Sequence, residues 1–318
     1  MLRLDAIRFR AVGTTCLLAA TSSVLDTPAA RAALVAGRIE LESCAQALSR
    51  FDPTSDLARL NAADGSWVRI DVRLGLALAA AVRARDETGG RFDPTILPAL
   101  VAAGYGRSYE LLELDQPARP PEGWRPGGLV EVDPSRMRAR LGRGVAVDLG
   151  GIGKGFAAER VVQAMRVAWA GLPGALVDLG GDIAVWGETP EGGPWLVAVE
   201  DPSRAGGKLG TIRLGAGGVA TSGPARRRFG PGRSLHHLID PATGRPAEGG
   251  PSAVTVVAPD AAAAEAYATA LAVSPLGGAE ALLGPGLGAI MAGVDDAAPI
   301  VVGDVDFAPH RSHQEVRS

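Results

Sequence analysis

The sequence has few of the residues that mark several common classes of protein. Only two of its 318 residues are cysteines, Cys16 and Cys44, and neither has a second cysteine or a histidine at metal-ligand spacing. A CxxC redox or zinc motif is therefore excluded, and we expect both thiols to be buried and reduced. No apolar run reaches the roughly 18 residues that a membrane-spanning helix needs, so we expect no transmembrane segment.

A strong net charge is also missing. The formal net charge is −3 at pH 7, and the charges form no long block of one sign. Because domains that bind nucleic acids carry a basic patch or stripe, we expect no nucleic-acid partner. Lysine is rarer than any other charged residue, since only Lys154 and Lys208 occur beside the many arginines. A lysine inside a glycine loop of such a chain indicates a site that needs a compact ammonium group.

The sequence does contain enough apolar residues for a folded core. Hydrophobic residues make up 47% and charged residues 21% of the chain, which is typical of one large domain or two packed lobes. The many glycines and prolines reflect a GC-rich coding bias as much as structural need. The uncharged residues 11–25 follow three arginines and superficially look like a secretory signal. Because Gly13, Thr14 and Thr15 interrupt that stretch, we expect a folded first strand instead.

The first part of the chain reads as helical. Apolar periodicity predicts helices over residues 29–48 and 72–88, and Gly89 with Gly90 closes the second helix. The stretch SRFDPTSDLARLN between these helices is polar and rich in turn residues. Prolines and glycines dominate residues 117–128, which we interpret as an exposed connection and the boundary between two lobes.

The second part of the chain reads as rich in strands. We predict a hairpin around Asp133 and Pro134, and buried strands in VTVVAP and LGAIMAGV. A helix should begin near Asp260, which is a good N-cap residue. Residues 304–318 end the chain as a polar tail. The fold class is therefore mixed α and β.

The pentapeptide VDLGG occurs twice, from Val147 and from Val177. In the first copy, residues 145–149 should form a strand, residues 150–155 a glycine loop and residues 156–170 a helix. Strand, glycine loop and helix form a geometry that binds anions, but the loop matches neither a Walker A motif nor GxGxxG. A phosphate site and a tight structural turn therefore both remain open.

The second VDLGG copy precedes IAVWG, which has the pattern of a strand instead of a helix. We therefore interpret the two copies as part of one βαβ unit whose strands end at the same sheet edge. Both glycine pairs would then form walls of one ligand pocket.

Three other segments contain residues that could support chemistry. Glu265 and Thr269 are four residues apart on one helix face and could hold a hard cation such as Mg²⁺, although a solvated Glu and a packed Thr are the alternative. His236 and His237 precede a rigid turn, where a histidine could act as a general base or satisfy the turn. The arginines of ATSGPARRRF form either a solvated basic loop or a surface for an anion or a partner.

Taken together and in this order, several motifs of the chain resemble those of the ApbE family, the FAD:protein FMN transferases. The motifs are AVGTT, SRFDPTSDLARLN, TGGRFDPT, VDLGGIGKGFAAE, VDLGGDIAVWG, ATSG, HHLIDPATGRP and AEAYATAL. The resemblance implies one catalytic unit over residues 1–318, with a two-lobed α+β fold of mixed sheets and packed helices that is related to the T-fold.

The resemblance also implies a reaction. Members of the family bind FAD and Mg²⁺, transfer the FMN part to a threonine of an acceptor protein, and release AMP. His237 matches the catalytic position. The positions implied to contact FAD are Val12, Phe51, Phe92, Asp93, Pro94, Asp148, Lys154 and Ile239. The metal ligands are implied at the Gly151 carbonyl, Glu265 and Thr269.

The chain departs from the family pattern at a few positions. Glu265 stands where the family has Asp, Phe51 replaces a common Tyr, and Ala268 replaces a second metal-site acid of some members. FAD hydrolysis to FMN and AMP, and FAD binding without catalysis, are therefore kept as alternatives. Because no lipobox precedes Cys16, which directly follows the AVGTT motif, we expect a cytoplasmic protein.

Overall fold

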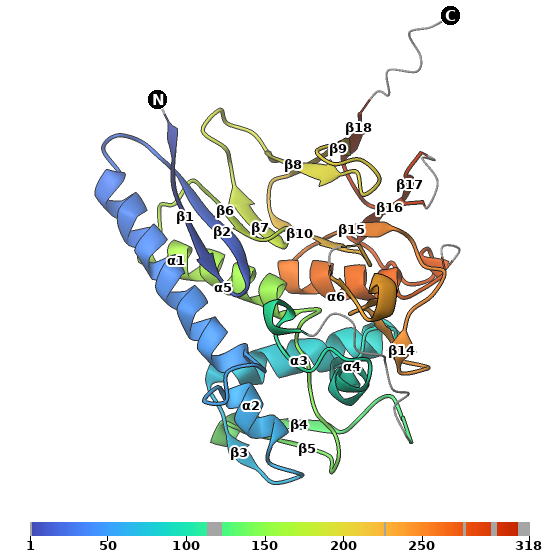
Figure 1. Ribbon diagram of the computed structural model, residues 1–318. Helices are drawn as coiled ribbons and strands as arrows, with labels where there is room; N and C mark the ends of the chain where they lie inside the picture. Colours follow the sequence, from blue (N-terminus) through green and yellow to red (C-terminus); the bar gives the residue numbers. More distant parts are fainter. Residues whose placement is uncertain (1, 113–122, 226, 276–277, 294–297, 311–318) are drawn as a thin grey trace, which may run out of the picture.

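The structure is a computed structural model that describes residues 2–112, 123–225, 227–275, 278–293 and 298–310 (Figure 1). Helices and antiparallel sheets together confirm the α+β class. The main sheet has eight strands in the order β1-β2-β6-β7-β10-β15-β16-β17. These strands are Arg3–Ala11, Thr14–Ser22, Gly174–Leu179, Ile183–Gly187, Gly217–Ser222, Ala253–Ala258, Gly288–Ala292 and Ile300–Gly303.

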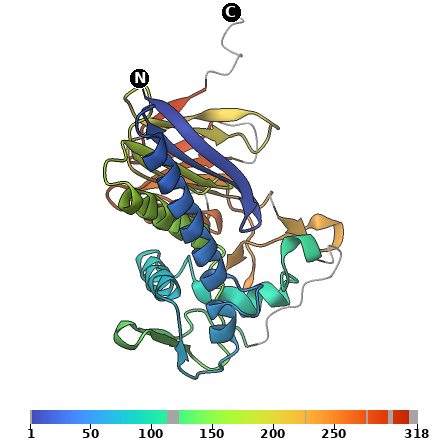
Figure 2. The ribbon, with the colours of Figure 1, turned by 90° about the vertical axis from the view of Figure 1, so that its left-hand side faces the viewer.

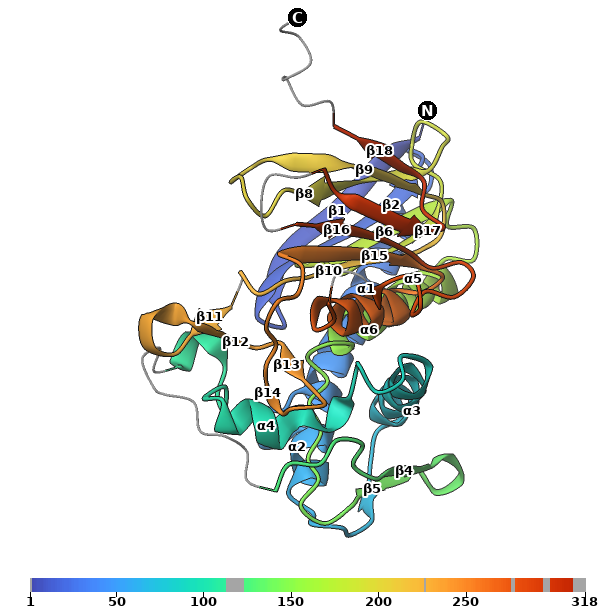
Figure 3. The ribbon, with the colours of Figure 1, turned by 90° about the vertical axis from the view of Figure 1, so that its right-hand side faces the viewer.

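The main sheet is covered on both faces (Figure 3). Successive side chains of a strand point to opposite faces. Accordingly, Ala220 and Val256 pack on a helix, whereas Val219 and Val257 pack on a second, three-stranded sheet. The covering helices are α1 (Thr27–Leu48), α5 (Gly153–Ala168) and α6 (Ala261–Ala272). The second sheet consists of β8 (Trp195–Glu200), β9 (Lys208–Leu214) and β18 (Phe307–Pro309).

The remaining elements lie beyond the ends of these helices. Figure 2 shows α1 running along the sheet toward this second part of the molecule. Its elements are α2 (Asp56–Asn61), β3 (Val68–Arg69), α3 (Val72–Glu87), α4 (Leu97–Ala102), β4 (Val130–Asp133) and β5 (Arg138–Leu141). Four short strands lie between β10 and β15: β11 (Arg228–Phe229), β12 (Leu235–His236), β13 (Ile239–Asp240) and β14 (Arg245–Pro246). Short 3₁₀ turns cover Pro94–Ile96, Tyr109–Leu111, Pro134–Arg136 and Pro231–Arg233.

Most elements with a clear periodicity are where the sequence predicts them. Helices α1 and α3 match the two predicted helices, and Gly89 and Gly90 follow α3 with φ of 59° and 79°. The hairpin β4–β5 and the strands β15 and β16 are also confirmed. The side chain of Asp260 caps α6 by accepting the amide N–H of Ala263 at 2.8 Å.

Several predictions fall on residues at or beyond the edge of what is described. Residues 117–122 of the predicted lobe boundary lie outside the described ranges, so the boundary stays a prediction. Within the predicted tail, Phe307–Pro309 form β18 and pair with β9, and residues 311–318 lie outside the described ranges. In the described part of the chain, no helix has both the length and the apolar character of a membrane span.

The expected folded strand at the N-terminus is confirmed, because Thr14–Ser22 form β2, which pairs with β1 in a hairpin that the sequence analysis did not predict. Ala11 pairs with Thr14, so Val12 and Gly13 form a two-residue turn. Both turn residues have positive φ, 45° and 71°, as a type I′ turn requires to match the twist of the strands. A β-branched residue rarely adopts this conformation, so Val12 is held under local strain at the tip of the hairpin.

The predicted strand at residues 145–149 is wrong. Residues 145–149 form no strand and pair with none in the described part of the chain. Instead, the Val147 amide donates to the Asn61 Oδ1 at 2.7 Å, and the Asn61 Nδ2 donates back to the Val147 carbonyl at 2.9 Å. The predicted βαβ unit therefore does not exist. Helix α5 begins at Gly153 and ends at Ala168, whereas the prediction covered residues 156–170.

A buried ion cluster joins three helices. Glu40 of α1 accepts from Arg73 of α3 at 2.6 Å and from Arg160 of α5 at 2.9 Å. Burial alone would raise the pKa of Glu40, but the hydrogen bonds from both arginines outweigh burial and lower the pKa. Removing one partner of such a cluster would leave a buried charge uncompensated, so the cluster fixes how the helices meet.

Helices α5 and α6 approach each other closely at Gly155. A Cβ atom at Gly155 would overlap the backbone carbonyl of Ala261, and a Cβ at Gly218 of β10 would overlap the Cα of the same alanine. The first turn of α6 is thus clamped between two glycines, and Ala261 itself is fully buried. The contact brings the N-terminal turn of α5 next to the side chains of α6.

Substitution of Gly155 should test this contact. Gly155→Ala should lower the free energy of unfolding by about 1–3 kcal/mol, because overpacking a tight contact costs this much despite the better helix propensity of alanine. Urea unfolding followed by circular dichroism measures the change. Gly153→Ala in the same helix is the control, since its Cβ would meet Leu149 at 3.6 Å, and it should change stability by less than about 0.5 kcal/mol. Equal losses in both variants would contradict the account.

Candidate functional site

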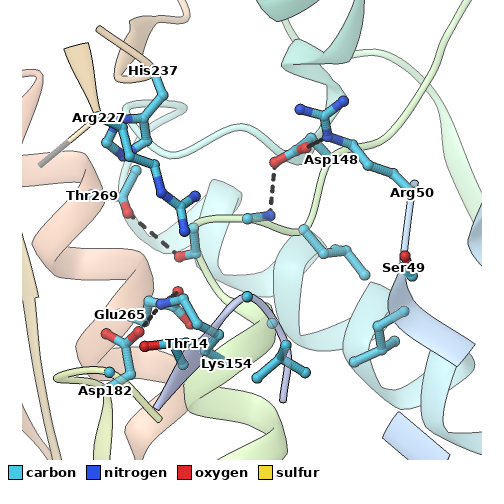
Figure 4. A pocket seen from close by; sticks show the side chains of 18 of the residues that line it. Thr14, Ser49, Arg50, Asp148, Lys154, Asp182, Arg227, His237, Glu265 and Thr269 are labelled. Atoms are coloured by element: carbon cyan, nitrogen blue, oxygen red, sulfur yellow. Dashed lines mark hydrogen bonds and ion pairs between the residues drawn. The ribbon is translucent and has the colours of Figure 1, made fainter. Parts of the chain in front are cut away.

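A cavity of about 910 Å³ lies where the three covering helices meet the second part of the molecule (Figure 4). This volume is at the upper end of small-molecule sites. The β1–β2 turn, the C-terminal end of α1, the N-terminal turn of α5 and the inner face of α6 all contribute lining residues. Segments from the whole length of the chain therefore meet in one place.

Almost all residues implied by the family resemblance line this cavity. They are Val12, Phe51, Phe92, Asp93, Asp148, Gly151, Lys154, His237, Ile239, Glu265 and Thr269. Pro94 does not line it. The carbonyl of Pro94 instead accepts the Asp148 amide at 2.8 Å, so this proline supports the wall from behind.

Asp93 lines the cavity but uses its carboxylate to organise the surrounding chain. Its Oδ1 accepts from the amide and the hydroxyl of Thr95, at 2.8 and 2.7 Å. Its Oδ2 accepts the Gly127 amide at 2.6 Å. Asp93 is 4% exposed, so its buried carboxylate connects the segment around Thr95 with the distant segment at Gly127 through hydrogen bonds.

The first VDLGG copy forms one wall of the cavity. Asp148 accepts the Gly150 amide at 2.7 Å through Oδ1, and its Oδ2 pairs with the Nε of Arg50 at 2.5 Å. The side chain of Arg50 is 6% exposed. Its guanidinium lies 4.1 Å from the ring centre of Phe51 and 5.2 Å from that of Tyr105. A buried cation therefore fixes the orientation of Asp148.

The second VDLGG copy forms the turn between β6 and β7 and also lines the cavity. Asp178 Oδ1 accepts the Gly181 amide at 2.7 Å, so the aspartate organises the turn as Asp148 does in the first copy. Gly180 and Gly181 have φ of 76° and 101°. The prediction that both copies wall one pocket is thus confirmed, although no shared parallel sheet edge brings them together.

The turn of the second copy ends at Asp182, which faces Lys154 from the first copy. The Lys154 ammonium forms ion pairs with the Asp182 carboxylate and with Glu265 Oε1, the latter at 3.0 Å (Figure 4). Glu265 Oε2 accepts the Gly155 amide at 2.7 Å. Glu265 is only 3% exposed, so the alternative of a solvated glutamate is wrong. Its carboxylate takes the position at the α5 N-terminus where an anion is stabilised.

A set of oxygen atoms surrounds Thr269, one turn after Glu265 on α6. The Thr269 Oγ1 lies 3.5 Å from the Gly151 carbonyl oxygen and 3.4 Å from the Ser222 Oγ. A Cβ on Gly151 would meet Thr269 Oγ1 at 2.9 Å, so only glycine leaves this approach free. A carboxylate, a hydroxyl and a carbonyl are donors that suit Mg²⁺, which takes further oxygens from water and phosphate. The residues present therefore fit a magnesium ion.

The two neighbouring histidines have different surroundings. The Nε2 of His236 lies 3.0 Å from the Ala247 carbonyl, and His236 does not line the cavity. His237 does line the cavity, and its Nδ1, like that of His236, is buried without a hydrogen-bond partner among the described residues. Burial lowers the pKa of His237 to about 3, and the positive charge of Arg227 acts in the same direction. The imidazole is therefore neutral near pH 7.

Arg50, Tyr105, Asp182 and Arg227 are among the cavity residues that the sequence analysis did not identify as single site residues. Tyr105 stacks on Phe229 at 5.6 Å and accepts from Arg227 Nη1 at 3.2 Å. Asp182 had a usable signal, because it directly follows the second glycine pair. Arg227 belongs to ATSGPARRRF, which the sequence analysis treated only as a basic loop or an anion surface.

The comparison with known proteins agrees with the resemblance. A model of the ApbE family matches residues 12–291. A curated FAD:protein FMN transferase of Haemophilus influenzae is 31% identical over 236 residues, which cover 71% of this chain and 68% of the relative. Another, of Treponema pallidum, is 32% identical over 285 residues, which cover 81% and 75% of the two chains.

Solved structures give the same picture. The ApbE protein of Thermotoga maritima matches with a TM-score of 0.76 at 28% identity, over 91% of this chain and 94% of that chain. The flavinyl transferase ApbE of Pseudomonas stutzeri has a TM-score of 0.77 at 24% identity, over 95% and 94%, and supports the fold alone. The chain therefore belongs to the ApbE family, in which the curated relatives above carry the name of a flavin-transferring enzyme.

Proposed function

We propose that this protein is a Mg²⁺-dependent FAD:protein FMN transferase, which moves the FMN moiety of FAD to a threonine hydroxyl of an acceptor protein and releases AMP. The cavity carries the proposal. It gathers a neutral histidine, a lysine, and an oxygen donor set for a hard cation within one space of about 910 Å³. The curated relatives bear the name of this activity.

The walls of the cavity suit the parts of FAD. Phe51 is 47% exposed at the wall and offers an aromatic face to a ring system. Val12, Phe92 and Ile239 offer apolar contacts, Asp148 offers a carboxylate held by Arg50, and Lys154 offers an ammonium at the end of a flexible stem. Lys154 has the charge to bind a phosphate oxygen of FAD. Glu265, Thr269 and the Gly151 carbonyl would hold Mg²⁺.

The proposed chemistry forms a bond between the threonine oxygen and the FMN phosphorus and breaks the bond from that phosphorus to the AMP oxygen. Mg²⁺, when bound, polarises phosphoryl oxygens and offsets their charge. His237 accepts the threonine proton as the new bond forms, which its neutral imidazole permits. AMP leaves as a phosphate anion and needs little help from an acid.

We also propose that the protein acts in the cytoplasm and is not processed as a lipoprotein at Cys16. Cys16 is fully buried in β2, where it pairs with Leu179 of β6. Cleavage before Cys16 would remove β1 and Val12 and expose an edge of the main sheet.

The transfer itself is tested by the intact mass of an acceptor protein that carries a threonine flavinylation motif. After incubation with this protein, FAD and Mg²⁺, the acceptor should gain one FMN moiety, and EDTA should abolish the gain because the phosphoryl charge is no longer offset. AMP should appear in equal amount. Release of FMN and AMP without an adduct would favour hydrolysis, and an adduct that forms equally in EDTA would contradict the metal requirement.

The role of His237 is tested by His237→Ala. FAD affinity, measured by fluorescence quenching, should change little, whereas the transfer rate should fall by roughly 10²- to 10⁴-fold because a general base is lost. His236→Ala is the matched control, because His236 lies outside the cavity lining and bonds to the Ala247 carbonyl. If His237→Ala transfers FMN as fast as the control variant, the proposed role is wrong.

A further inference from the structure

We propose that Asp182 and Glu265 form a carboxylate pair for which the Lys154 ammonium and a divalent cation compete, so that Lys154 leaves Glu265 when the cation binds. This inference rests on the proposed function, because the cation is the Mg²⁺ proposed at Glu265 and Thr269. It adds Asp182 to that metal site as a carboxylate that favours cation binding, and Lys154 as a positive charge that competes with the cation.

The pair is assembled from three distant segments. Lys154 lies in the first turn of α5, Asp182 follows the β6–β7 turn, and Glu265 lies on α6. The side chains of Asp182 and Glu265 are 5% and 4% exposed, and that of Lys154 is 27% exposed. In the described part of the chain, no other cationic side chain forms an ion pair with either carboxylate.

Both oxygens of Glu265 are already in use. Oε2 accepts the backbone amide of Gly155 at 2.7 Å, and Oε1 contacts the Lys154 ammonium at 3.0 Å. The amide cannot move, because the tight contact of Gly155 with Ala261 fixes it. The ammonium can move, since it ends a flexible four-carbon stem and borders the open cavity. A cation that binds Glu265 directly therefore displaces Lys154.

The charges favour the same exchange. Two carboxylates and one ammonium leave a net charge of −1 in a largely buried place. A divalent cation that joined them would raise this charge to +1, whereas a cation that replaces the ammonium leaves zero. A buried excess charge is costly, so binding of the cation drives the ammonium into the cavity. There it becomes available to a phosphate of FAD.

The test is the affinity of FAD-free protein for Mn²⁺, followed by electron paramagnetic resonance with Mn²⁺ as the probe for Mg²⁺. Lys154→Met should bind Mn²⁺ roughly tenfold more tightly, because a competing positive charge within a few ångströms is removed. Asp182→Asn should bind it roughly tenfold more weakly, because a negative charge is lost while Lys154 stays on Glu265. The double variant should return close to the wild-type affinity.

Lys208→Met is the matched control. Lys208 is the only other lysine of the sequence, lies exposed on β9, and its loss changes the net charge equally. Its affinity for Mn²⁺ should equal that of the wild type. If Lys154→Met and Lys208→Met both bind Mn²⁺ more tightly, the total charge of the protein explains the change. The proposed competition between Lys154 and the cation would then be wrong.

The remaining outcomes separate this inference from the proposed function. Unchanged or weaker Mn²⁺ binding in a folded Lys154→Met variant would overturn the competition. If that variant does not fold, Asp182→Asn decides, since unchanged binding there would also overturn it. If Glu265→Ala binds Mn²⁺ like the wild type, the proposed metal site itself is wrong.

Discussion

The close contact between α5 and α6 at Gly155 is the constraint on which the site depends. Because neither Gly155 nor Gly218 carries a side chain, Ala261 fits between α5 and the main sheet. The inner face of α6 then lies beside the first turn of α5, and Glu265 reaches the Gly155 amide and Lys154. Backbone packing thus places Glu265 and Lys154, which we propose to bind the metal and a phosphate of FAD, next to each other.

Several charged side chains inside this fold are paired with groups of opposite charge, and these ion pairs have different roles. Glu40 of α1 joins α3 and α5 through ion pairs with Arg73 and Arg160. Arg50 is buried against Asp148 and two aromatic rings, and it holds one wall of the cavity. The lysine between two carboxylates differs, because its flexible stem borders the cavity. Arginine thus serves the fixed contacts described above, and the partly exposed Lys154 serves the contact that we propose to change.

Much of the fold could be predicted from local patterns, because helical periodicity and capping residues such as Asp260 act within a few residues. The segment at Val147 could not, since its partner is the side chain of Asn61, 86 positions away. Most of the cavity residues could be predicted because the order of the motifs along the sequence resembles that of the ApbE family. Arg50 was missed because its contacts with Asp148, Phe51 and Tyr105 are tertiary and no spacing in the sequence encodes them. Asp182 was missed although it directly follows the second glycine pair.

The measurement that most directly tests the central claim is a crystal structure with FAD and Mn²⁺, with the metal located by its anomalous scattering. The account predicts a manganese ion coordinated by the Glu265 carboxylate and Thr269 Oγ1, with FAD in the cavity between the two VDLGG turns. A metal bound away from α6, or FAD bound outside this cavity, would contradict it.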